Sequence, residues 1–332
     1  MKLSKMPKKS TAKTLIKSAD SRKVSKANTT CDRAASAGRQ MTETFAPKNI
    51  AIMYRPGNSD AVKQAGDLAG WLMEQHFVVF STPDQKFGAP QAKIKKVTPQ
   101  NLATLDWVIV LGGDGTYLRA VRMLEGRQTP ILGINMGSLG FLTETRVEDL
   151  YKTVISTLQK KMEFRPRAML NVEVRRGGKL VATHFALNDA VLERGSNTHL
   201  INIEIFSQKH LVGQVKADAL IIATPTGSTA YNLAAGGPIL HPETRAIVVT
   251  PVCPHALTSR PLIFPDDEQL SFKVLTKDKR VVLTVDGLHC GEITFEDEVV
   301  IVRNELDHFV IRKPSSNYFS LLREKLQFGQ RN

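Results

Sequence analysis

At 332 residues and 42% apolar content, the chain is long enough to bury two hydrophobic cores, so we expect two domains. It has neither a run of roughly 20 apolar residues that could cross a membrane nor an N-terminal secretory signal. Its three cysteines lack the spacing of a disulfide framework or a zinc site. These features favour a cytoplasmic protein with no membrane partner and no protein-bound metal.

The positive charge is concentrated at the N-terminus. Residues 1–46 contain eleven Lys/Arg and three Asp/Glu, a net charge of +8, which leaves +5 of the total +13 for the other 286 residues. The low apolar content of this segment predicts a disordered basic tail, with a mitochondrial-type transit peptide or a start at Met41 as alternatives. The remaining chain is only mildly basic, which favours a site for polyanionic small molecules over a nucleic-acid groove.

Strand-like and helix-like segments alternate across residues 47–165. Apolar runs predict buried strands, and apolar residues spaced three or four apart predict helices. The alternation predicts a doubly wound α/β domain around a parallel sheet. The expected strands are 49–54, 77–80, 106–111 and 131–135, and the expected helices are 60–75, 116–125 and 147–161.

Residues 166–310 have a different texture, with period-two apolar runs separated by turns, which predicts a β-rich, sandwich-like domain. Within residues 311–332, helical spacing returns over 318–326, and we expect this C-terminal helical segment to pack back on the α/β domain. The expected strands of the β-rich domain are 170–175, 181–187, 200–206, 219–224, 246–250, 270–275, 281–285 and 299–303.

The sequence GGDGT at residues 112–116 lies between a predicted strand and a predicted helix, where open parallel sheets bind ligands. Its glycines permit positive φ and let backbone N–H groups approach phosphate, and the helix N-terminus favours anions. Asp114 is placed to accept a proton from a hydroxyl nucleophile, and the absence of a lysine distinguishes the loop from a Walker A motif. A plain Asp-Gly turn is the alternative for the motif alone.

Three further segments have a composition suited to ligand binding. The loop Asn135–Leu142 follows a predicted strand, and Phe141 offers an aromatic face, although a lone aromatic is commonly part of a core. Asn188-Asp189 combines an amide with a carboxylate, which suits a ribose diol, with an Asx turn as the alternative. Residues 216–238 contain TPTGSTAY and GGP, a small-residue turn that brings hydroxyls and amides close to a planar ligand.

Together these segments resemble the NAD kinase family, in which GGDGT, an Asn-acid pair, and TPTGSTAY followed by GGP occur in this order. Residues 251–262 also resemble the family's following segment, and the likeness covers roughly residues 49–326. The resemblance implies transfer of the γ-phosphoryl group of ATP to the 2′-hydroxyl of the adenosine ribose of NAD, giving NADP and ADP. It further implies NAD and ATP as substrates, Mg²⁺ carried by ATP, and a homodimer or homotetramer.

The resemblance also implies roles for individual residues. Asp114 resembles the proton acceptor, and the phosphate loop matches at Gly112, Gly113, Gly115 and Thr116. The implied NAD contacts are Asp114, Gly115, Phe141, Asn188, Asp189, His199, Lys216, Asp218, Thr226, Thr229, Ala230, Tyr231, Asn232, Leu233 and Ala234. Two positions depart from the family: the pair is Asn-Asp where Asn-Glu is commoner, and Leu288 replaces a frequent glutamine, so no contact is assigned there.

Two other functions compete with this interpretation. A kinase of the wider GGDG group that acts on a lipid or a sugar phosphate would share the phosphate loop, but TPTGSTAY and the Asn-Asp pair indicate a dinucleotide pocket. A non-catalytic NADP-sensing or nucleic-acid-binding protein would fit the basic tail. The intact loop around Asp114 favours a catalytic protein over this second alternative.

Overall fold

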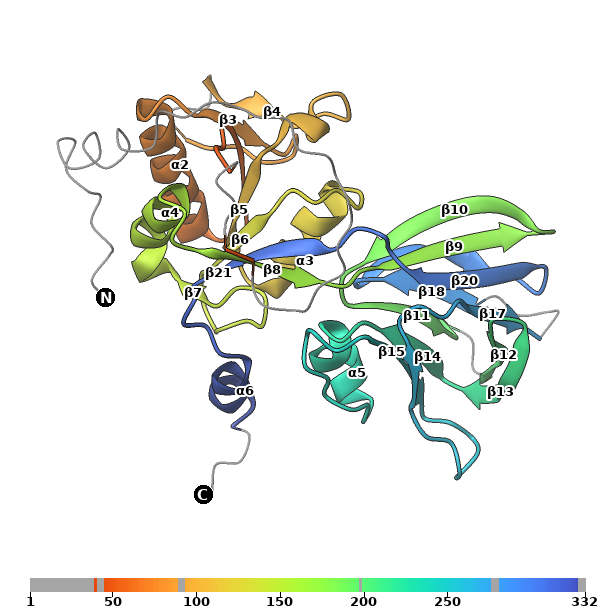
Figure 1. The fold of residues 1–332 in the computed structure, drawn as a ribbon. Helices are drawn as coiled ribbons and strands as arrows, with labels where there is room; N and C mark the ends of the chain where they lie inside the picture. The colour runs from red at the N-terminus through yellow and green to blue at the C-terminus, as the bar shows by residue number, and fades with distance from the viewer. Residues whose placement is uncertain (1–38, 41–44, 89–92, 197–198, 276–280, 328–332) are drawn as a thin grey trace, which may run out of the picture. The chain divides into compact units, whose positions relative to one another are not determined.

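In the computed structural model, residues 39–40, 45–88, 93–196, 199–275 and 281–327 are described, and they form two compact units (Figure 1). The α/β unit comprises the described residues up to Ala120, Thr129–Pro166, and those from Phe309 onward. The β-rich unit comprises Val121–Gln128 and Arg167–His308. Residues 121–128, which the sequence predicts to lie in the first domain, group with the β-rich unit.

A largely parallel sheet forms the centre of the α/β unit. Its strand order is β1-β8-β21-β6-β5-β2-β3-β4, with β7 beside β6. Strands β2, β3, β5 and β6 are mutually parallel where they pair, and every residue of β5 and β6 is buried, as in a sheet covered on both faces. The bounds are β1 Arg39–Gln40, β2 Asn49–Tyr54, β3 Val78–Ser81, β4 Lys95–Lys96, β5 Trp107–Gly112, β6 Ile131–Asn135, β7 Thr145–Arg146, β8 Glu163–Arg167 and β21 His308–Arg312.

The helices of this unit begin and end close to the predicted positions. Asn58 caps the first of them, because its side chain accepts a hydrogen bond from the Ala61 N–H. The indole of Trp71 packs edge-on against the ring of Tyr151, with centroids 5.8 Å apart. The bounds are α2 Ser59–Glu74, α3 Asp114–Met123, α4 Leu150–Leu158 and α6 Tyr318–Leu326, with 3₁₀ turns η3 Leu102–Thr104 and η4 Val147–Asp149.

The N-terminal boundary of the α/β unit lies earlier than predicted. Strand β1 pairs antiparallel with β8, and the Phe45 ring lies edge-on to Trp107 and Phe164, at centroid distances of 6.3 and 5.2 Å. The prediction of a disordered tail extending to residue 46 is therefore wrong for the described residues of that segment. A single aromatic side chain in a polar sequence is ordered here by a cluster whose other members come from distant strands. Residues 1–38 and 41–44 lie outside the described part.

The C-terminal helix α6 belongs to the α/β unit, which confirms the expected return. Asn317 caps it by accepting hydrogen bonds from two backbone N–H groups, and Leu321 and Leu322 are buried. Glu324 forms an ion pair with Arg146 at 2.9 Å, and Lys325 Nζ donates to the Leu139 carbonyl at 2.7 Å.

The β-rich unit is a sandwich of two six-stranded antiparallel sheets, which confirms the predicted fold class (Figure 1). The strand orders are β10-β9-β20-β17-β12-β13 and β16-β15-β14-β11-β18-β19, and one core contains side chains from both sheets. The bounds are β9 Leu170–Arg176, β10 Lys179–Ala186, β11 Asp189–Glu193, β12 Ile201–Ser207, β13 His210–Ala217, β14 Ala219–Ala223, β15 Ala246–Val252, β16 Leu262–Pro265, β17 Leu270–Val274, β18 Val281–Val285, β19 Leu288–Ile293, β20 Asp297–Arg303, η5 Gly227–Thr229 and α5 Tyr231–Ala234.

Across the described residues, each helix falls short of the length and apolar character needed to span a bilayer.

Candidate active site

Two loops of the α/β unit meet at one edge of its sheet. Strands β5 and β6 are parallel neighbours, with Gly112 in register with Asn135, so the loops that follow them start side by side. Helix α3 begins at Asp114, and the N–H groups of Thr116 and Tyr117 bond to the Gly113 carbonyl. The edge therefore combines a helix N-terminus with two glycine-containing loops, an arrangement suited to anionic phosphates.

The Asp114 carboxylate is held by the loop after β6. Its Oδ1 accepts hydrogen bonds from the N–H groups of Leu142 and Thr143, both at 3.1 Å, and from Thr143 Oγ1 at 3.0 Å. Its Oδ2 accepts one from the Phe141 N–H at 2.8 Å. Because a carboxylate oxygen has two lone pairs, Oδ2 keeps an acceptor position beyond its contacts with the described residues. The side chain is thus fixed in orientation and can still accept a substrate hydroxyl.

Gly140 and Asn135 make this arrangement possible. A Cβ at Gly140 would lie 2.0 Å from Asp114 Oδ1, so any larger residue would displace the carboxylate. The Asn135 amide donates to the Ser138 carbonyl at 2.6 Å, and its Oδ1 accepts from the Gly137 N–H at 2.7 Å. These residues fix the loop around Asp114, and we gave them no such role from sequence.

The glycines of GGDGT work differently from the prediction. Glycine permits positive φ, but Gly112, Gly113 and Gly115 do not adopt it. A Cβ at Gly112 would lie 2.5 Å from Thr116 Oγ1, which explains that glycine by packing. A Cβ at Gly113 or Gly115 would meet nothing within 4 Å. Open space beside these two backbone segments is what close approach of a phosphate requires.

Phe141 is partly buried, and part of its surroundings is already occupied. Lys325 Nζ of α6 lies 5.2 Å from the centroid of its ring, and Arg312 donates a hydrogen bond to its carbonyl. The predicted contact of this ring with a base stays a prediction.

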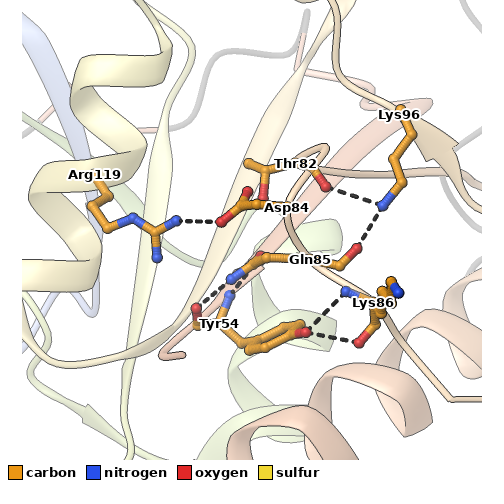
Figure 2. Close-up of polar contacts among 7 residues, drawn as sticks. All are labelled: Tyr54, Thr82, Asp84, Gln85, Lys86, Lys96 and Arg119. Carbon is orange, nitrogen blue, oxygen red and sulfur yellow. Dashed lines mark hydrogen bonds and ion pairs between the residues drawn. The ribbon is translucent and has the colours of Figure 1, made fainter. Parts of the chain in front are cut away.

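Figure 2 shows a polar network that fixes the segment after β3 against the end of β2. The Gln85 side chain bonds to both the N–H and the carbonyl of Tyr54, and the Tyr54 hydroxyl bonds to the N–H and carbonyl of Lys86. Lys96 Nζ donates to the carbonyls of Thr82 and Gln85. The network makes this part of the sheet edge rigid.

Helix α3 is tied to the same segment. Its Arg119 forms an ion pair with Asp84 at 2.9 Å (Figure 2). Because Arg119 lies five residues after Asp114 on the same helix, this contact helps to fix the position of α3, at whose first residue Asp114 lies. The sequence offered no signal for it, since the two residues are 35 positions apart.

In the β-rich unit, the Asn188-Asp189 pair is positioned by Asp286. The Asp286 carboxylate accepts hydrogen bonds from the N–H groups of Leu187, Asn188 and Asp189, at 2.8–3.1 Å. Asp286 has φ of 45°, in the left-handed region of the turn between β18 and β19. We gave Asp286 no role from sequence, although the Asp-Gly pair at 286–287 was a visible turn signal.

Asp189 is a buried acid with no hydrogen bond to its carboxylate within the described part of the chain. Burial, together with the nearby negative charge of Asp286, raises the pKa of Asp189 to about 7. Burial also raises the pKa of Asp286, while its three N–H donors and Arg122 oppose that rise. A ligand that brings hydroxyl donors to Asp189 would relieve the cost of its buried charge.

The TPTGS turn lies directly against Asn188. The Thr224 N–H donates to the Asn188 carbonyl at 2.8 Å, and a Cβ at Gly227 would lie 2.1 Å from that oxygen. Thr226 Oγ1 is buried and has no hydrogen-bond partner among the described residues, so a ligand could satisfy it. The structure thus brings the Asn188-Asp189 pair and the TPTGSTAY segment together.

Among residues 229–234, which follow the turn, Asn232 is buried and the others are partly or fully exposed. Asn232 is fully buried, and its side chain bonds to the carbonyls of Ser228 and Pro238 and to the Thr250 hydroxyl. These bonds give the Asn232 side chain a scaffold role, and its predicted contact with NAD stays a prediction. The neighbouring residues with partly or fully exposed surface are Thr229, Ala230, Tyr231, Leu233 and Ala234.

Asp218 has a partner that the sequence did not reveal. It forms an ion pair with Arg194 at 2.8 Å, so its negative charge is offset in the absence of substrate. His199 and Lys216 are exposed. Lys216 lies at the end of β13, where its carbonyl accepts from the His255 N–H.

Within the described residues, no group of three or more His, Cys, Asp or Glu side chains could hold a metal ion.

Comparison with known proteins finds two family matches along the chain. The ATP-NAD kinase N-terminal domain matches residues 50–162, and the ATP-NAD kinase C-terminal domain matches residues 187–312. An NAD kinase from Bdellovibrio bacteriovorus is 54% identical over 286 residues, covering 86% of this chain and 93% of the relative. An NAD kinase from Geobacter metallireducens is 38% identical over 86% of this chain and 100% of the relative.

The chain is also similar in structure to solved NAD and NADH kinases. Yeast NADH kinase complexed with NADH superposes with a TM-score of 0.80 at 26% identity, covering 91% of this chain and 94% of that one. An NAD kinase from Archaeoglobus fulgidus in complex with ATP has a TM-score of 0.64 over 84% of this chain and 98% of that one, and at 21% identity it supports the fold alone.

Proposed function

The chain belongs to the NAD kinase family, and from this membership we propose how its residues transfer the γ-phosphoryl group of ATP to the 2′-hydroxyl of the adenosine ribose of NAD, giving NADP and ADP. The observation that carries the proposal is the Asp114 carboxylate. It is fixed by four hydrogen bonds at a helix N-terminus, and Oδ2 keeps an acceptor position.

Phosphoryl transfer needs in-line positioning and charge stabilisation more than covalent chemistry from the protein. The open backbone at Gly113 and Gly115, with the first N–H groups of α3, binds the donor phosphates. Asp114 Oδ2 accepts a hydrogen bond from the 2′-hydroxyl, orients its oxygen toward the γ-phosphorus, and takes the proton as the new bond forms. The bond between the γ-phosphorus and the bridging oxygen breaks, and ADP leaves with that oxygen.

The β-rich unit supplies the acceptor site. The Asp189 carboxylate and the Asn188 amide bind a ribose diol, and Thr226 Oγ1 gains the hydrogen-bond partner that it lacks. The surface that we propose to contact NAD includes Thr229, Ala230, Tyr231, Leu233 and Ala234. It also includes Lys216 near the end of β13, Asp218 directly after that strand, and His199 before β12.

A divalent ion completes the reaction. The described residues do not form a cage for it, and the oxygens of Asp114 already accept four donors, so we propose that Mg²⁺ is held by the phosphates of ATP and neutralises their charge. We also propose that the enzyme acts in the cytoplasm as a homodimer or homotetramer.

The test incubates the purified full chain with Mg-ATP and, in separate reactions, NAD, NADH, diacylglycerol or fructose 6-phosphate, and measures ADP. NADP is quantified with an NADP-specific dehydrogenase. We expect ADP and NADP in equal amounts with NAD, whereas ADP formed only with the lipid or the sugar phosphate would refute the proposal. The NADH reaction is included because the yeast relative is an NADH kinase.

A further inference from the structure

A cavity of the β-rich unit is lined by residues other than those given roles in the proposed function. It has a volume of about 760 Å³, within the range of small-molecule sites. All of its lining residues belong to the β-rich unit, from the segment 122–127, strand β10, the end of β18, strand β19 and the loop after β20.

The lining combines apolar side chains with polar and charged ones. Leu288 and Leu306 are about half exposed, at 49% and 46%, and form an apolar rim together with the Phe185 ring. Arg122 has no acidic side chain paired with it in the described part of the chain; its Nη1 donates to the Asp286 carbonyl at 3.0 Å. Arg127, by contrast, is paired with Glu125 at 3.1 Å. The cavity therefore has, beside its apolar side chains, a guanidinium that acts on the buried Asp286 carboxylate but forms no direct ion pair among the described residues.

A buried polar atom in the same cavity also lacks a partner. His184 Nε2 is buried and makes no hydrogen bond to any described residue. Burial lowers the pKa of His184, so this side chain is neutral and can donate or accept one hydrogen bond. An unsatisfied buried nitrogen is unusual in a folded protein, and a ligand with a polar head group would satisfy it.

The cavity is connected to the ribose-binding pair through one residue. Val285 and Leu288 line the cavity and flank the Asp286–Gly287 turn. The Asp286 carbonyl accepts from Arg122, while its carboxylate holds the N–H groups of Asn188 and Asp189. An anion bound to Arg122 would compete with the Asp286 carbonyl for the Arg122 N–H donor. It would also add negative charge beside the buried carboxylates of Asp189 and Asp286. Both effects disfavour the ionised form of Asp189 that accepts a diol.

We propose that this cavity is a regulatory site for a small amphipathic anion, with its apolar part against Leu288, Leu306 and Phe185 and its anionic group on Arg122, and that its occupation weakens NAD binding. The second half rests on the proposed function, because it takes Asn188 and Asp189 as the acceptor site. The first half concerns binding alone.

The probe is 8-anilinonaphthalene-1-sulfonate, an aromatic sulfonate whose fluorescence rises on binding. Titration of the full chain should show one saturable site. Leu306→Asp, which adds a negative charge at the exposed rim, should weaken binding at least about tenfold, and Arg122→Gln should do the same by removing a charge-assisted hydrogen bond. The matched controls are Leu180→Asp, 57% exposed on β10, and Arg260→Gln, both outside the cavity, and these should bind normally.

Calorimetry then measures NAD affinity with and without saturating probe. We expect NAD affinity to fall by about fivefold or more in the unmutated chain, as for a typical allosteric coupling, and to stay unchanged in Leu306→Asp. Equal probe binding in all four variants would overturn the site. Displacement of the probe by NAD in Leu306→Asp as readily as in the unmutated chain would also overturn it, because the probe would then occupy the NAD site. Failure to form NADP would refute the proposed function and leave the probe titration unaffected.

Discussion

The buried charge of Asp189 makes a prediction about stability as well as binding. Its pKa is raised to about 7 in the folded chain from its ordinary value of 3.8, since burial and the nearby charge of Asp286 disfavour the carboxylate. A raised pKa of an acid stabilises the folded state at low pH, and this stability is lost as pH rises through the folded-state pKa. Replacing Asp189 with asparagine removes the titrating group while keeping its size, so the loss should disappear.

The magnitude follows from the pH interval over which the two states differ in protonation. Between about pH 5 and pH 7 the folded chain holds a proton on Asp189 that the unfolded chain has released, and each pH unit is worth about 1.4 kcal/mol. The unmutated chain should therefore lose about 3 kcal/mol of unfolding free energy relative to Asp189→Asn across this interval, with little further change above pH 8. Groups that do not interact with Asp189 titrate alike in both proteins, so their contributions cancel in the comparison.

Urea denaturation of both proteins at pH 5, 6, 7 and 8 measures this difference. Asp286→Asn is the control: it leaves three buried N–H groups with a weaker acceptor and should be destabilised throughout the range. NAD affinity of the unmutated chain should rise with pH through about 7, because the ionised carboxylate accepts the diol, and Asp189→Asn should lose this dependence. A stability difference between Asp189→Asn and the unmutated chain that does not vary with pH would refute the reasoning.

Four further outcomes are expected. Asp114→Asn should lower turnover by about 10² to 10⁴ with little change in NAD affinity, and retention of more than about a tenth of normal turnover would exclude Asp114 as the base. Gly140→Ala should also reduce turnover strongly, because its Cβ would meet Asp114 at 2.0 Å, whereas Gly137→Ala, which meets nothing within 4 Å, should be nearly normal. Arg194→Gln should raise the preference for NAD over NADH in kcat/KM by freeing the charge of Asp218, and Asp218→Asn should lower it only slightly; a large effect of Asp218→Asn would show that the ion pair does not offset this charge. Phe45→Ala should cost about 2 kcal/mol of unfolding free energy, measured with urea, and the exposed Phe319→Ala should cost far less.

The local elements of the α/β unit follow from the sequence because their signal is local. Strands β2 and β6 begin and end at the predicted residues, and so does α6. A buried parallel strand is a continuous apolar run, and a helix that packs on one face repeats its apolar residues at a fixed interval. Neither signal depends on which distant segment covers the element.

Several strands of the β-rich unit were missed because their pattern depends on tertiary position. Strand β13 lies at the edge of its sheet, and most of its residues before Ala217 are exposed or partly exposed, so it carries little apolar alternation. Strand β11 begins at Asp189, two residues after the end of the expected strand 181–187, and it was not predicted. Aspartate is disfavoured both in strands and at buried positions, so its place in β11 is explained only by the three-dimensional surroundings.

The sequence by itself determined which segments to propose as ligand-binding, namely GGDGT, the Asn-Asp pair and TPTGSTAY, because glycines, carboxylates and hydroxyls in loops after strands are typical of binding sites. Only the tertiary structure decided how they are held. Asp114 depends on Gly140, Asp189 on Asp286, and Asp218 on Arg194, and the partners in these pairs are 24 to 97 positions apart. Chain folding brings such partners together, and nothing in the spacing of one motif encodes the position of another.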